Sequence, residues 1–322
     1  MLAPPKPSHS PIARLRFGPA LLRLAGMTAL CLVFFTHEDL VERTFDSLAQ
    51  VHSGWLLLGL LLYVGGQLVS ALRVRTLVVA TDHDVAYTTL LADGLKATGL
   101  SATLVMGAGD AYRIARLRTA GLGLVEASGV VIADRAIGLF AVASVAIPCL
   151  AGFGAELGGF TIARVPSLVL TVCAFAAALF LARRMAIRWL PNARAFLEEP
   201  RLGPPLLAFS TIVLALWIAS VFAFARSLDL EVGMGVLASA ASLVTLATLL
   251  PISIGGVGVR EAGYVLLLAP YGVSSSEAIA LGLLQYGAMI AVSSIAWVAW
   301  IADALRRSKS RVPAMQTEAD EI

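Results

Sequence analysis

Long stretches without charge limit what this chain can fold into more than any other feature of its sequence. A helix needs about 20 mostly apolar residues to cross the hydrocarbon core of a bilayer, and most of these stretches are long enough. A soluble fold could not hide so much apolar surface, since 58% of the 322 residues are hydrophobic and only 14% are charged. The sequence therefore predicts an all-α, polytopic integral membrane protein. The apolar runs are 17–36, 51–72, 136–155, 165–182, 206–225, 232–259, 262–276 and 278–302.

The distribution of Lys and Arg predicts how the chain is threaded through the membrane. Basic residues concentrate in cytoplasmic loops, and they are abundant in a leader at 1–16, a loop at 183–201 and a tail at 305–322. The loops on the opposite side hold one arginine each. We therefore expect about eight crossings with both termini cytoplasmic. The run 17–36 is interpreted as a retained first helix, because it shows no cleavage site.

One segment, 84–106, is membrane-like in composition but contains Asp93 and Lys96. It lies between two basic stretches, 73–75 and 113–118, and a full crossing would place one of them outside. The segment is therefore predicted to enter and leave on the cytoplasmic side, as a re-entrant or broken hairpin. Such non-helical backbone is tolerated at membrane depth only where protein or water covers it.

Two glycine interruptions, one in each half of the chain, are each followed by an arginine and a carboxylate. Paired interruptions of this kind point to an internal repeat with a binding site near the repeat interface, within one domain at 17–304 whose halves are 17–182 and 206–304. Glycine lets the chain leave the helix, and exposed N–H groups beside an arginine suit an anion such as phosphate. The alternative is that the glycines only allow close helix packing. The residues are Gly107, Gly109, Asp110 and Arg113, then Gly255, Gly256, Gly258, Arg260 and Glu261.

A third charged feature is the Asp134-Arg135 pair, in a stretch otherwise apolar from Leu124 apart from Glu126. If a helix begins near Leu124, Asp134 lies about 15 Å along it. An ionisable residue at such depth faces a polar cavity or a partner. If the helix begins later, the pair lies at the membrane interface, and both interpretations leave it close to Arg113.

Motifs of soluble chemistry are missing from the sequence. No P-loop, G-x-S-x-G or H-E-x-x-H is present, so neither nucleotide hydrolysis nor a hydrolase is indicated. The scattered arginines form no basic domain for nucleic acid. The histidines and cysteines lack the spacing of metal ligands, so we expect no metal and no cofactor. They are His9, His37, His52, His83, Cys31, Cys149 and Cys173.

The stretch 249–286, LLPISIGGVGVREAGYVLLLAPYGVSSSEAIALGLLQY, strongly resembles the C-terminal signature of the lysylphosphatidylglycerol synthase transmembrane-region family of flippase-like proteins. The first half is similar to the family too, through MGAGDAYRIARL, the Asp134-Arg135 motif and an arginine at 73 or 75. It departs from the pattern where Ala108 replaces a glycine and the preceding proline is absent. The C-terminal matches are Pro251, Gly255, Gly256, Gly258, Arg260, Glu261, Gly272, Val273 and Ser274.

In relatives this region is joined to a soluble aminoacyl-transferase domain, which these 322 residues do not contain. The resemblance therefore implies handling of a polar lipid rather than lysyl transfer, in a bacterial-type inner membrane. Stand-alone members associated with hopanoid biosynthesis are similar in size. The favoured hypothesis is a translocase without its own ATPase and without catalytic residues, acting on a membrane lipid and alongside lipid-biosynthesis enzymes. The alternatives are a membrane-embedded enzyme, or subunit of a lipid- or hopanoid-modifying or glycosylating complex, and a scaffold without a ligand.

The predicted head-group residues come from all three charged features. The arginines would bind a phosphate, and the carboxylates would position them or bind a cationic part of the head group. The binding candidates are Gly109, Asp110, Arg113, Asp134, Arg135, Gly255, Gly256, Gly258, Arg260 and Glu261, with Arg73, Arg75, Asp93, Lys96 and Pro251 as accessory candidates.

Overall fold

The computed structural model describes residues 38–104, 107–153, 203–248 and 255–319, and all the regular structure in these ranges is helical. The predicted leader, the crossings 17–36 and 165–182, and Pro251 lie outside the described residues. The helices are α2 (Glu38–Ala49), α3 (Ser53–Val79), α4 (Tyr87–Thr103), α5 (Ala108–Thr119), α6 (Leu124–Phe153), α9 (Gly203–Ser227), α10 (Met234–Ala247), α11 (Val259–Leu268), the 3₁₀ turn η2 (Ala269–Tyr271) and α12 (Ser275–Ala319).

Four of the described helices are long and apolar enough to cross a bilayer, which agrees with a polytopic membrane protein. These candidate spans are Ser53–Val79, Leu124–Ala146, Gly203–Ser227 and Ser275–Ala302. Large apolar side chains remain exposed along them, as lipid-facing residues do; examples are Leu57, Leu61, Ile212, Ile295 and Val298.

Two predicted crossings take a different form. The run 232–259 does not form one helix, because α10 has 14 residues and ends at Ala247. The run 262–276 contributes to α11, which has 10 residues. At 1.5 Å per residue these helices rise about 21 and 15 Å, short of a hydrocarbon core about 30 Å thick. The α10–α11 pair is therefore a second broken hairpin, comparable with α4–α5.

The order of helices repeats in the two halves of the chain. A long helix, two short helices and another long helix occur as α3, α4, α5 and α6, and again as α9, α10, α11 and α12. The second short helix begins after a glycine with positive φ in both halves, Gly107 at 89° and Gly258 at 85°. Residues with a Cβ rarely adopt this conformation. The matched breaks support an internal structural repeat.

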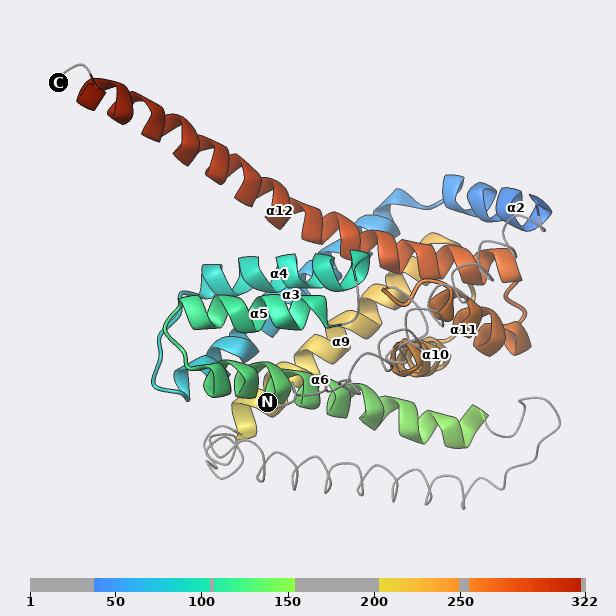
Figure 1. The fold of residues 1–322 in the computed structure, drawn as a ribbon. Helices are drawn as coiled ribbons and strands as arrows, with labels where there is room; N and C mark the ends of the chain where they lie inside the picture. The colour runs from blue at the N-terminus through green and yellow to red at the C-terminus, as the bar shows by residue number, and fades with distance from the viewer. Residues whose placement is uncertain (1–37, 105–106, 154–202, 249–254, 320–322) are drawn as a thin grey trace, which may run out of the picture.

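The long helices α3 and α9 lie side by side and join the two halves (Figure 1). Small residues bring them close together, as in other membrane helix pairs. A Cβ added at Gly59 would meet the Phe224 ring at 2.5 Å, and the Ser220 hydroxyl donates to the Gly59 carbonyl over 2.9 Å. The short helix α4 packs against α3, and the short helix α10 packs against α9.

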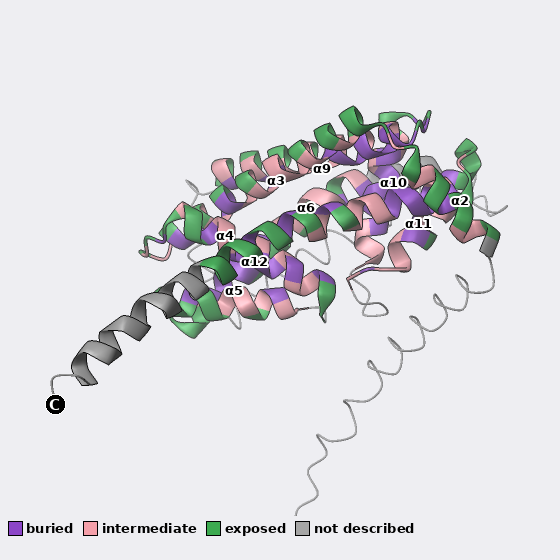
Figure 2. Cartoon of the chain, turned by 90° about the horizontal axis from the view of Figure 1, so that it is seen from above, coloured by how far each residue is buried: buried purple, intermediate pink, exposed green. Residues whose placement is uncertain are grey.

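Buried apolar residues form two separate cores at opposite ends of α9. One contains Leu206 of α9 with Leu77 and Val78 of α3 and residues of α4, α5 and α6. The other contains Phe224 of α9 with residues of α10, α11 and α12, including Tyr264. Figure 2 shows the buried positions gathered over α10 and α11, while exposed positions recur along α3 and α12. Buried residues of α4 and α5 thus belong to one core, and those of α10 and α11 belong to the other.

Candidate functional site

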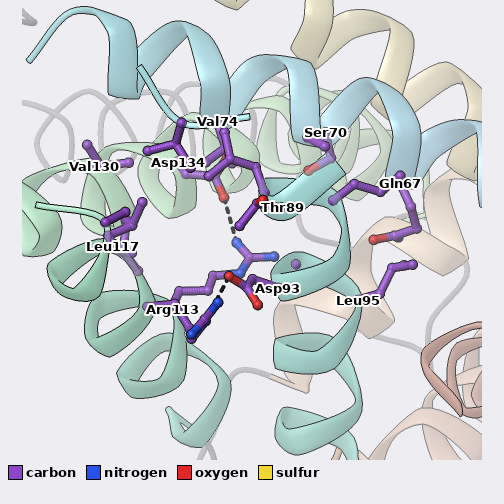
Figure 3. Close-up of a pocket in the computed structure, with 18 of the residues that line it drawn as sticks. Gln67, Ser70, Val74, Thr89, Asp93, Leu95, Arg113, Leu117, Val130 and Asp134 are labelled. Atoms are coloured by element: carbon purple, nitrogen blue, oxygen red, sulfur yellow. Dashed lines mark hydrogen bonds and ion pairs between the residues drawn. The ribbon is translucent and has the colours of Figure 1, made fainter. Parts of the chain in front are cut away.

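A cavity of about 330 Å³ lies among α3, α4, α5 and α6, in the first half of the repeat (Figure 3). Apolar side chains, including Val74, Leu95, Leu117 and Val130, alternate around it with hydroxyl, amide and charged groups. The polar lining residues are Gln67, Ser70, Thr89, Asp93, Arg113, Arg116, Thr119 and Asp134.

Asp134 anchors one buried charge cluster at this cavity. Its carboxylate is 2.8 Å from Arg73 Nη2 and 3.1 Å from Arg113 Nη1, and it also accepts a 2.9 Å hydrogen bond from Arg73 Nε. Arg73 and Asp134 are both almost fully buried, at 6% and 4% exposure. Because α6 begins at Leu124, the interpretation that placed Asp134 about 15 Å along a helix and facing partners is the one observed.

The charge pattern suggested that Arg73 and Arg75 follow the helix predicted at 51–72. They lie within a helix instead. The helix α3 continues to Val79, so both arginines belong to its last turns. Arg75 faces outward and is 3.5 Å from the exposed Asp84, whereas Arg73 points inward to Asp134. The helix can continue past Arg73 because Asp134 supplies the counter-charge that a buried arginine needs.

Asp93 anchors a second charge cluster on the opposite side of the cavity. Its carboxylate accepts hydrogen bonds of 3.0 Å from Arg116 Nε and from the Tyr112 hydroxyl, and Lys96 Nζ is 3.7 Å away. Burial, together with the Asp93 charge, raises the pKa of Tyr112 to about 12. The phenol donates its proton in the hydrogen bond to the carboxylate.

The two clusters leave an excess of positive charge beside the cavity. Four cations, Arg73, Lys96, Arg113 and Arg116, share two carboxylates. Arg113 Nε is also buried without a hydrogen-bond partner. An anionic group in the cavity would balance this charge and give Arg113 an acceptor.

Asp110 and Arg135 pair with each other instead of lining the cavity. Arg135 Nη2 is 2.7 Å from the Asp110 carboxylate, and the arginine side chain is half exposed. Gly109 acts through packing, since an added Cβ would lie 2.1 Å from the Ala97 carbonyl oxygen of α4. These three predicted residues hold α5 against α4 and α6.

The second glycine break meets the C-terminal end of α4. A Cβ at Gly255 would lie 2.3 Å from the Ala102 carbonyl oxygen, and the Tyr286 hydroxyl donates to the same oxygen over 3.1 Å. The Arg260 guanidinium lies over the Tyr286 ring, 5.8 Å from its centre. The Glu261 carboxylate accepts a hydrogen bond from the Gly258 N–H and so caps α11.

The predicted site residues do not all lie at one place in the structure. Arg113, Asp134 and Asp93 meet at the cavity, whereas the residues that line it do not include Arg260 or Glu261. Gln67, Ser70 and Thr89 were missed, because single polar residues in apolar helices are ordinary packing residues in most membrane proteins. Within the described ranges, no group of three His, Cys, Asp or Glu residues is placed to hold a metal ion.

Comparison with known proteins identifies the family. The family described as lysylphosphatidylglycerol synthase TM region matches residues 19–304, a range that includes both hairpins, the cavity and the Arg260 break. No curated protein matches the chain. Because the match extends over most of the 322 residues, the chain belongs to the lysylphosphatidylglycerol synthase transmembrane-region family.

Proposed function

We propose that this protein binds and translocates a polar, phosphate-bearing lipid, without an ATPase of its own. The observation that carries the proposal is the cation excess of the two charge clusters beside the cavity, where Arg73, Lys96, Arg113 and Arg116 share two carboxylates. Of these cations, Arg113 and Arg116 line the cavity itself. A phosphate supplies the missing negative charge, and its oxygens accept hydrogen bonds from the arginine fork. The acyl or polyprenyl tail would remain in the surrounding lipid.

The orientation follows from the same basic residues. The cavity lies at the end of the bundle that carries Arg75, Arg116 and Arg118, and basic residues favour the cytoplasmic side. The lipid would therefore enter from the cytoplasmic leaflet of a bacterial-type inner membrane, with both termini inside. Lipid-biosynthesis enzymes, including those of hopanoids, are the partners that would supply such a lipid.

The contacts of the carboxylates favour translocation over an embedded enzyme. A general base needs a carboxylate free to take a proton from the substrate. Asp134 is held by two arginines, and Asp93 by Arg116, Tyr112 and Lys96. Both carboxylates are occupied in positioning cations, which is the task of a binding site.

The test is leaflet exchange in reconstituted liposomes, using labelled anionic, zwitterionic, polyprenyl-phosphate and hopanoid lipids. We expect Arg113→Gln to slow exchange of the preferred lipid about tenfold or more, the effect of losing one charge-assisted hydrogen bond. Arg73 still holds Asp134 in this variant. Arg118→Gln, on an exposed position of the same helix, is the matched control and should exchange at the wild-type rate.

Two results would overturn the proposal. One is exchange no faster than in empty liposomes for every lipid, with a chemically altered product in extracts. The other is an equal loss in the Arg113 and Arg118 variants, which would show that the cavity has no special part in exchange.

A further inference from the structure

Arg260 lies near the middle of the membrane-spanning part of the protein. Its guanidinium is over the ring of Tyr286, and Tyr286 is close to the midpoint of the candidate span Ser275–Ala302. Tyr286 also bonds to Ala102, the end of a helix that starts at the arginine-rich end of the bundle. Both contacts place the guanidinium deep within the bundle, at a position where ionisable residues are costly and functional.

Arg260 has no described carboxylate within ion-pair distance of its guanidinium. No hydrogen bond joins the guanidinium to a described side chain, and Nη1 is buried without an acceptor. The neighbouring carboxylate of Glu261 is turned toward the Gly258 N–H and lies against Gly282. An arginine presents five donors, so this group has unused capacity for an anion.

The position of Arg260 relative to the cavity is set by α4. Asp93 lines the cavity, and Ala102 contacts Gly255 and Tyr286 at the other end of the same helix. Asp93 and Ala102 are nine positions apart, which corresponds to a rise of about 13.5 Å along the helix. Arg260 therefore lies beyond the cavity in the direction in which α4 runs from Asp93 to Ala102.

We propose that Arg260, seated on Tyr286, is a second anion-binding station that receives the phosphate of the lipid head group after it leaves the cavity. This inference rests on the proposed function. A single unpaired cation matches the single negative charge of a phosphodiester. The aromatic face keeps the guanidinium plane fixed, and the partly buried side chain keeps a donor without a described acceptor that suits a phosphate oxygen.

The first test measures whether Arg260 binds an anion. In maltoside detergent, a membrane-permeant arginine reagent such as phenylglyoxal is applied with phosphatidylglycerol, with inorganic phosphate or with neither, and modification of each arginine is read by mass spectrometry. We expect phosphatidylglycerol to protect Arg260 about tenfold. Arg226, which lies over Phe222 at 5.1 Å, is the internal reference and should be unaffected. Protection by inorganic phosphate alone would assign the site to a free anion and contradict the lipid station.

The second test measures whether binding at Arg260 contributes to the rate of lipid exchange. Arg260→Gln should exchange phosphatidylglycerol about tenfold or more slowly, while Arg113 keeps its lipid-dependent protection. Arg260→Lys should keep part of the rate, because a point charge replaces a fork. The matched control, Arg226→Gln, should exchange at the wild-type rate.

The outcomes separate this inference from the proposed function. If lipid protects Arg260 but the wild-type protein exchanges no lipid, the proposed translocation is contradicted and the anion site at Arg260 is supported. Two results would contradict the second station while leaving the proposed function of the cavity intact. One is exchange by Arg260→Gln at the wild-type rate, and the other is an unprotected Arg260 in a protein that exchanges lipid.

Discussion

The hairpins α4–α5 and α10–α11 have the same backbone plan but treat charge in opposite ways. Both break at a glycine with φ near 90° and then start a short helix. Around the first hairpin, every cation named at the cavity has a carboxylate within 4 Å, whereas Arg260 of the second has none among the described residues. The two copies of a repeat can therefore share a backbone geometry while the cations of one copy are paired with carboxylates and the arginine of the other has no carboxylate partner among the described residues.

The largest predicted effect comes from removing the carboxylate that pairs with two arginines at the first hairpin. Asp134→Ala leaves Arg73 and Arg113 buried without a counter-charge, and we expect it to lower the free energy of unfolding by about 3–5 kcal/mol. The control is Asp84→Ala, which removes an exposed partner of Arg75 and should cost less than about 1 kcal/mol. Chemical denaturation in detergent measures both, and similar losses would contradict the buried role of Asp134.

The next effect concerns the contact between the two hairpins. Gly255→Ala adds a Cβ 2.3 Å from the Ala102 carbonyl oxygen in a residue with φ of 62°, so overpacking and strain together should cost about 3 kcal/mol. Gly272 also has positive φ, at 79°, but has open space around it. Gly272→Ala should therefore lose only the strain component, about 1 kcal/mol. Equal shifts in thermal unfolding would show that the close contact with α4 is unimportant.

A smaller effect compares the paired and the unpaired arginine directly. Arg73→Gln removes a charged donor from Asp134 and should lower the free energy of unfolding by about 2 kcal/mol. Arg260→Gln removes a cation without a carboxylate partner and should change it by less than about 1 kcal/mol, with lipid exchange affected instead. A large stability loss in the Arg260 variant would assign that residue to the fold.

The sequence predicted the class of fold because hydropathy depends on local composition, and it predicted both breaks because glycine and charge stand out in apolar runs. It placed Arg73 in a cytoplasmic segment after the apolar run 51–72, since its partner Asp134 is 61 residues away and only the folded chain brings them together. It also treated 232–259 as a crossing, because an apolar run does not reveal that its helix ends at Ala247. The cavity depends on the packing of four helices and had no local signal.

The separation of the two buried cores has a consequence for local opening. Since they share no buried residue among those that the structure describes, the amide hydrogens of each hairpin should exchange with solvent as a separate cooperative unit. A lipid that binds only at the cavity would slow exchange in α4 and α5 and leave α10 unchanged. The α3–α9 pair, packed through Gly59 and Ser220, should be the slowest to exchange and so act as the fixed reference for the motion of both hairpins.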